Sequence, residues 1–215
     1  MLPEGYNSAY ELMSKGGVIM WPILICSILA LAIAIERFYS LRRVSIDTRE
    51  FMDIIRTALR QNRIQEAVGI CDEANAPIAR IIKAGILKFD RAKEDIREAI
   101  EDAGHLELPR LERYMNALGT CAHIAPLLGL LGTVQGMIRC FAAIENKQGQ
   151  VNPSDLAEGI ANALITTFAG LSVAIPTLVV YNYLLSRVEN MVVEMEISSS
   201  ELVDVLTRNR GEREI

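Results

Sequence analysis

The chain has 215 residues, of which 51% are hydrophobic and 6% aromatic, with 22 basic and 27 acidic side chains. A net charge of −5, with no basic face that carries interleaved aromatic residues, gives no reason to expect nucleic-acid binding. The apolar residues gather in a few stretches instead of being spread evenly, which excludes an ordinary soluble globule. We therefore expect a membrane protein with charged segments outside the bilayer.

Three windows, residues 16–35, 114–138 and 159–186, contain no Asp, Glu, Lys or Arg. Each is long enough to cross a hydrocarbon core of roughly 30 Å as a helix rising about 1.5 Å per residue. The first window is longer than the apolar core of a secretory signal peptide, so we interpret it as a retained span. The predicted fold class is all-α, a polytopic membrane protein with three transmembrane helices, of which the second and third extend into the cytoplasm.

The distribution of basic residues predicts the orientation. Fifteen of the 22 Lys and Arg residues lie between positions 37 and 113. Because cytoplasmic segments carry the excess of basic residues, this region and the C-terminal tail are expected inside the cell and the N-terminus outside. The predicted order is a periplasmic segment (1–15), span 1 (16–36), a cytoplasmic helical region (37–113), span 2 (114–140), a periplasmic connection (141–157), span 3 (158–186) and a cytoplasmic helical tail (187–215).

Apolar residues recur at steps of three and four in the 37–113 region and in the tail. This spacing predicts short amphipathic helices near residues 51–59, 64–71, 78–87 and 93–111, with turns at Asn62 and at 75–77. In the tail it predicts one seam of a bundle or coiled coil. The seam residues are Leu185, Val188, Val192, Met195, Ser199, Leu202 and Leu206. We expect the short helices to brace the cytoplasmic ends of the second and third spans.

Small residues form stripes in the second and third windows. Gly129, Gly132 and Gly136 repeat at three- and four-residue steps in the second window, and Gly170 belongs to a similar stripe in the third. Such stripes let two helix backbones approach closely. We assign these glycines to helix packing, together with two prolines in the same stretches, Pro126 and Pro176.

Polar side chains also occur inside the spans, where no water is available to solvate them. By the predicted orientation, Thr133 and Thr167 both lie roughly 9 to 12 Å from the outer end of their spans. Hydroxyls at matched depth can hydrate a pore, although Thr in a membrane helix often bonds its own backbone. Asn162 and Thr166 stand one turn apart beside Thr167. We interpret His123 as an interhelical packing group in preference to a proton relay.

No Asp, Glu, Lys or Arg lies within any window, so if protons cross here, the titrating group must come from elsewhere. The four cysteines are far apart and form no C-x-x-C pair, and His105 and His123 have no neighbouring ligands at metal-site spacing. We expect no metal, cofactor or disulfide framework. Paired acids or a Ser–His arrangement are also missing from the spans, so an intramembrane enzyme is disfavoured.

Two long motifs carry a family resemblance. Residues 125–138 read APLLGLLGTVQGMI, and residues 159–176 read GIANALITTFAGLSVAIP, followed by Tyr181-Asn182. Together with the three-span order, they resemble the MotA/TolQ/ExbB proton-channel family and are closest to its ExbB/TolQ branch.

The resemblance implies an inner-membrane pentamer around the single transmembrane helices of an ExbD- or TolR-like partner dimer. An Asp of the partner would carry the proton, and Thr133 and Thr167 would line its path. Several members have Glu where this chain has Asn162, an amide that hydrogen-bonds but does not titrate. The implied function is to convert proton-motive force into mechanical work through a TonB- or TolA-like protein, for outer-membrane transport or envelope maintenance. A flagellar-stator-like or gliding motor subunit and a non-conducting membrane scaffold are the alternatives.

Overall fold

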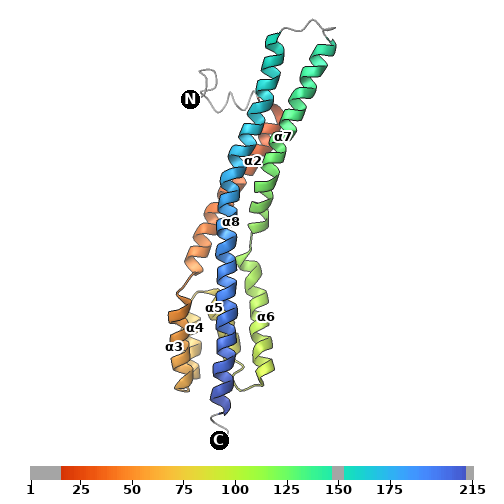
Figure 1. Ribbon diagram of the computed structural model, residues 1–215. Coiled ribbons are helices and arrows are strands. Elements are labelled where there is room, and N and C mark those ends of the chain that lie inside the picture. The colour runs from red at the N-terminus through yellow and green to blue at the C-terminus, as the bar shows by residue number, and fades with distance from the viewer. Residues whose placement is uncertain (1–15, 147–152, 212–215) are drawn as a thin grey trace. The chain divides into compact units, whose positions relative to one another are not determined.

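The computed structural model describes residues 16–146 and 153–211, and its described part is helical without strands. A 3-10 turn, η2 (Gly17–Ile19), precedes seven α-helices (Figure 1). They are α2 (Met20–Val44), α3 (Thr48–Arg60), α4 (Ile64–Glu73), α5 (Pro77–Ile86), α6 (Lys93–Leu111), α7 (Met115–Asn146) and α8 (Pro153–Gly211). The predicted periplasmic segment 1–15, residues 147–152 of the predicted connection 141–157 and residues 212–215 of the predicted tail lie outside the described residues.

Within the described residues, three helical stretches are long and apolar enough to cross a membrane: Gly17–Arg60, Lys93–Glu145 and Leu156–Arg208. They include α2 and most of α7 and α8, so the predicted all-α fold with three spanning helices is confirmed. The helices themselves continue past the charge-free windows, because the residues that follow each window also favour helix.

The chain divides into two compact units. Described residues up to Glu36 and from Tyr114 to Tyr183 form the first, which we call the apolar unit. Residues 37–113 and the described residues from Leu184 onward form the second, the charged unit. One dividing point, between residues 113 and 114, is where the sequence changes from charged to charge-free, and another, between residues 36 and 37, lies one residue past the end of the first charge-free window.

In the apolar unit, a small core joins α2 to the other two helices. Ile19, Met20 and Ile23 are buried against Leu128 of α7 and against Ala169 and Val173 of α8. These side chains recur at three- and four-residue steps, so they share one face of each helix. The same helices expose large apolar side chains elsewhere, among them Ile28, Leu131 and Phe168. An exposed apolar surface of this kind suits contact with lipid or with other membrane helices.

In the charged unit, α3 to α6 pack in chain order, each against the next. The Asp47 side chain caps α3 by accepting hydrogen bonds from the backbone N–H groups of Arg49 and Glu50. Asn62 adopts φ +61° in the turn after α3, a conformation that Asn tolerates well. The predicted short helices 51–59, 64–71, 78–87 and 93–111 correspond to α3, α4, α5 and α6.

The C-terminal part of α8 contributes its apolar seam to the core of the charged unit. Val188, Met195, Leu202 and Leu206 are buried, and Ser199 is half-buried. Polar bonds flank the seam: Glu194 accepts a hydrogen bond of 2.8 Å from Thr48, and Glu201 pairs with Arg56. The periodicity of the tail therefore reflects packing within one chain.

Candidate functional site

The contact between α7 and α8 in the apolar unit is built from small residues. A Cβ atom added to Gly132 would overlap the Thr166 side chain, and one added to Gly170 would lie 2.6 Å from the Ala125 carbonyl oxygen. Gly129 and Gly170 meet backbone to backbone, since the same added Cβ would lie 3.0 Å from the Gly129 Cα. The two helices thus approach too closely here for any residue larger than glycine.

Nearer the C-terminal end of α7, Gly136 faces Ala163, whose Cβ would lie 2.6 Å from a Cβ added at position 136. Gly159 of α8 packs against the Cys140 side chain. Gly159 was absent from the predicted packing set, although its four-residue spacing from Ala163 is a small-x-x-x-small signal that could have identified it.

Three threonine hydroxyls lie at this contact, and each makes a hydrogen bond. Thr133 donates to the Leu130 carbonyl oxygen at 2.7 Å and Thr166 donates to that of Ala163 at 2.6 Å, both within their own helices. Thr167 instead donates across the contact to the Gly129 carbonyl oxygen at 2.9 Å. Because a hydroxyl oxygen has two lone pairs, each of these oxygens can still accept a hydrogen bond from water or from a protonated side chain.

The candidate path residues differ in burial. Thr166 is only 2% exposed and lies between the helices against Gly132. Thr133, Thr167 and Asn162 are half-buried. Thr133 lies four residues beyond Gly129, about 6 Å along α7 from the carbonyl that Thr167 binds. The structure therefore brings Thr133 and Thr167 to neighbouring levels of one helix pair, with Thr166 enclosed between the two helices.

The two prolines differ in environment. Pro126 is half-buried inside α7, and Pro176 is exposed inside α8. Each lies within an uninterrupted helix, so neither ends a span. Proline in a spanning helix removes one backbone hydrogen bond and leaves one carbonyl oxygen available for another donor.

His123 of α7 is exposed within the chain, so it does not pack between helices of its own subunit as the sequence led us to expect. Its Nδ1 atom lies 2.6 Å from the Gly119 carbonyl oxygen. The ring of Tyr181 on α8 packs on Gly119 itself, 3.0 Å from where a Cβ would lie. Gly119 was not singled out in the sequence, and Tyr181 was noted there only as part of the second family motif.

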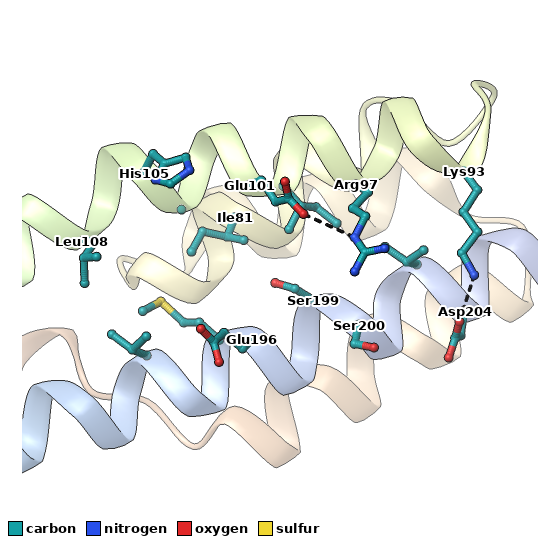
Figure 2. A pocket seen from close by; sticks show the side chains of 15 residues that line it. Ile81, Lys93, Arg97, Glu101, His105, Leu108, Glu196, Ser199, Ser200 and Asp204 are labelled. Carbon is teal, nitrogen blue, oxygen red and sulfur yellow. Dashed lines mark ion pairs between the residues drawn. The ribbon is translucent and has the colours of Figure 1, made fainter.

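The charged unit contains a separate hollow of about 600 Å³ between α6 and α8, with Ile81 of α5 on its wall (Figure 2). Its rim carries the ion pairs Arg97–Glu101 and Lys93–Asp204, with N–O distances of 3.3 and 3.7 Å. None of the predicted path residues lines it. Lys93, Arg97, Glu101 and Asp204 on its rim are already paired, and the predicted path residues lie elsewhere, so we place the candidate site at the α7–α8 contact.

A buried carboxylate organises another part of the charged unit. Glu107 of α6 is 3% exposed and accepts hydrogen bonds of 2.6 Å from both Arg80 of α5 and Arg110. Arg37, also 3% exposed, donates to the Arg110 carbonyl oxygen at 3.3 Å. Arg37, the first residue after the predicted first span, therefore makes a contact within the protein.

Among the residues that the structure describes, no group of three His, Cys, Asp or Glu side chains is placed to hold a metal ion. The chemistry available at the α7–α8 contact is thus that of hydroxyl, amide and backbone carbonyl groups in an apolar surround. Such groups hydrogen-bond to water or to a protonated side chain without carrying net charge themselves.

Comparison with known proteins decides the family. A sequence model of the MotA/TolQ/ExbB proton channel family matches residues 73–197, which include the whole α7–α8 contact. The chain belongs to this family. Its ExbB/TolQ branch is shown by relatives along most of the chain, as the sequence motifs predicted.

Three ExbB- or TolQ-named relatives illustrate the similarity. The protein ExbB-like 1 of Synechocystis is 38% identical over 176 residues, covering 80% of this chain and 68% of the relative. The Tol-Pal system protein TolQ of Haemophilus influenzae is 30% identical over 193 residues, covering 83% and 84%. The biopolymer transport protein exbB1 of Vibrio cholerae is 29% identical over 176 residues, covering 79% and 76%. This chain is thus a membrane protein of a proton-channel family, which is not a known enzyme class.

Proposed function

We propose that this chain is the ring-forming subunit of an inner-membrane proton channel. Five copies surround the single transmembrane helices of an ExbD- or TolR-like partner dimer, with the N-terminus periplasmic and the C-terminus cytoplasmic. Proton flow through the ring does mechanical work that a TonB- or TolA-like protein passes to the outer membrane, for transport or envelope maintenance.

One observation carries the proposal: α7 and α8 present hydroxyl groups at neighbouring levels in spans that hold no charged residue of their own. A wall of this kind hydrates a passing proton carrier without trapping it by ion pairing. Asn162 fits the same role, because its amide donates and accepts hydrogen bonds but cannot compete for the proton.

The energy available matches the task. One proton crossing a membrane potential of 100 mV releases about 2.3 kcal/mol. In the proposed cycle, a partner carboxylate at the Thr133 and Thr167 level takes a proton, becomes neutral and can leave the polar layer for an apolar one. Releasing the proton on the inner side reverses that preference, so each cycle moves the partner helices one step within the ring.

The test is proton flux in vesicles that contain the full chain and its carboxylate-bearing partner. We expect Thr133→Val and Thr167→Val to reduce flux at least tenfold, with the subunit count unchanged by native mass spectrometry. Thr133→Ser and Thr167→Ser keep the hydroxyl and should conduct. Undiminished flux in both valine variants would remove the hydroxyl layer from the path.

A non-conducting scaffold is the second candidate, and the hydrogen bonds of the threonines favour it. In a single chain all three hydroxyls already bond backbone carbonyl oxygens, and Thr166 is enclosed at Gly132. A scaffold predicts that the assembled wild-type ring with its partner conducts no protons at any membrane potential. Flux that depends on the partner carboxylate eliminates the scaffold.

A further inference from the structure

We infer that His123 is a proton-accepting group on the inner half of the channel wall. This inference rests on the proposed function and adds to it a titratable residue that this chain itself supplies. Protons that have passed the hydroxyl layer would leave toward the cytoplasm through the His123 ring.

The hydrogen bond of the ring determines which nitrogen is available. The Gly119 carbonyl oxygen can only accept, so the Nδ1 atom 2.6 Å away carries the hydrogen. The Nε2 atom of the neutral ring is then a lone-pair acceptor, and the exposed position of His123 leaves it open to the surroundings. Tyr181, by packing on Gly119, supports the helix turn that holds the ring in this orientation.

The depth of His123 argues against a place at the headgroup boundary. It lies eight residues after Met115, where α7 begins, and sixteen before Arg139, which corresponds to about 12 and 24 Å of helix. With a hydrocarbon core of roughly 30 Å centred on residues 114–138, the ring lies well inside it. An unpaired nitrogen at that depth is unfavourable against lipid, so Nε2 is expected to face water or protein in the assembled ring.

The exposed face of α7 changes character at this residue. Asn116, Thr120 and His123, spaced by four and three residues, are all exposed on one face, and Thr120 donates to the Asn116 carbonyl oxygen at 2.7 Å. Further out, the same face continues with Leu127, Leu130 and Val134, which are exposed and apolar. His123 is therefore the deepest member of a polar stripe that opens at the inner end of the helix.

Water is the only other reactant that the proton transfer needs. Water beyond the hydroxyl layer delivers a proton as hydronium; the Nε2 lone pair takes it, leaving neutral water and an imidazolium whose Nδ1–H still bonds Gly119. The imidazolium then returns the Nε2 proton to water at Thr120 and Asn116. A base at this depth gives the proton a resting place between two polar regions, at Thr120 and at Thr133, that lie about 20 Å apart along α7.

Few other titratable groups are close. Cys121 neighbours His123 in α7 and is buried against Cys26 of α2, while Tyr181 lies on α8 behind Gly119. No Asp, Glu, Lys or Arg occurs in residues 16–35, 114–138 or 159–186. Any dependence of inner-side proton release on pH that is lost with His123 can therefore be assigned to its ring.

The decisive variant is His123→Asn, since the Asn amide can still donate to the Gly119 carbonyl oxygen but has no titratable nitrogen. In vesicles with the partner subunit, we expect it to lower proton flux at least tenfold and to flatten the dependence of flux on inner-side pH. His105→Asn, on α6, is the matched control and should leave both unchanged. Imidazole added to the inner solution should restore flux to His123→Gly.

The outcomes separate this inference from the proposed function. If the wild type conducts and Thr133→Val does not, but His123→Asn has wild-type flux and pH profile, His123 is not on the path and the proposed function stands. If the wild type itself does not conduct, both fail. If His123→Asn does not assemble, a second variant is used: His123→Cys in a chain whose native cysteines have been replaced. Its rate of labelling by a water-soluble thiol reagent is measured. Labelling no faster than at Ile28→Cys would overturn the inference; faster labelling supports it.

Discussion

The hydroxyl of Thr167 on α8 donates a 2.9 Å hydrogen bond to the carbonyl oxygen of Gly129 on α7. The bond joins two spanning helices at the point where glycine lets their backbones meet. One residue is thus placed both to hold the helix pair together and to offer an oxygen at the level of Thr133. Packing and conduction can be separated by comparing the two threonines.

We predict that Thr167→Val lowers the stability of the assembly as well as its proton flux, whereas Thr133→Val lowers flux alone. The Thr167 bond crosses between helices and is worth about 1 kcal/mol in a membrane protein, while Thr133 bonds only its own helix. Thermal unfolding in detergent measures the difference. Equal melting temperatures for the two valine variants would show that the interhelical bond does not stabilise the pair.

We predict that Gly170→Ala disrupts the α7–α8 contact. The new Cβ would lie 2.6 Å from the Ala125 carbonyl oxygen and 3.0 Å from the Gly129 Cα, and backbone atoms cannot rotate away. Overpacking of this kind costs about 1–3 kcal/mol. The control is Gly69→Ala on α4, where nothing lies within 4 Å and alanine should stabilise the helix by about 0.5–1 kcal/mol. Subunit counting and thermal unfolding should show opposite effects of the two variants.

We predict that Glu107→Gln weakens the charged unit by about 1–3 kcal/mol. The substitution leaves Arg80 and Arg110 without the buried carboxylate that accepts both of their hydrogen bonds. Glu101→Gln is the control, because its pair with Arg97 is mostly exposed and contributes little. Protease resistance of residues 37–113 in the full chain distinguishes the two. Identical digestion rates would contradict a stabilising role for Glu107.

We predict that the Cys71 thiol of α4 reacts slowly with water-soluble disulfide reagents at neutral pH. Cys71 is 3% exposed, and burial, reinforced by the neighbouring Asp72 carboxylate, raises its pKa from 9.0 to about 12 against the opposing effect of Lys83. Only the thiolate is nucleophilic, so the folded chain should label far more slowly than the denatured one.

The same shift in pKa links Cys71 to stability. Between pH 9 and about 12 the unfolded thiol loses its proton while the folded one keeps it, so its contribution to stability is complete below that window and is lost as the pH rises through it. Cys71→Ala should unfold with a weaker dependence on alkaline pH than the wild type. An unchanged dependence would show that the thiol does not titrate differently in the two states.

Much of this protein is determined by local pattern. Charge-free windows longer than a bilayer is thick require helices, because backbone groups in hydrocarbon must bond within their own segment. The three- and four-residue steps at Val188, Met195 and Leu202 likewise determine which face of the tail is buried. Each of these features depends on residues near one another in the chain, which is why they could be predicted from the sequence.

Tertiary structure decided what depends on two helices at once. Spacing alone does not show that Thr167 bonds Gly129 while Thr166 is enclosed at Gly132. Adjacent threonines point about 100° apart around α8, and the register of α7 against α8 decides which of them meets which glycine. Nor does it show that His123 is exposed and bonded through Nδ1, since burial depends on what the other spans cover. The sequence determines which residues enter the membrane, and the fit of α7 against α8 decides which of them touch.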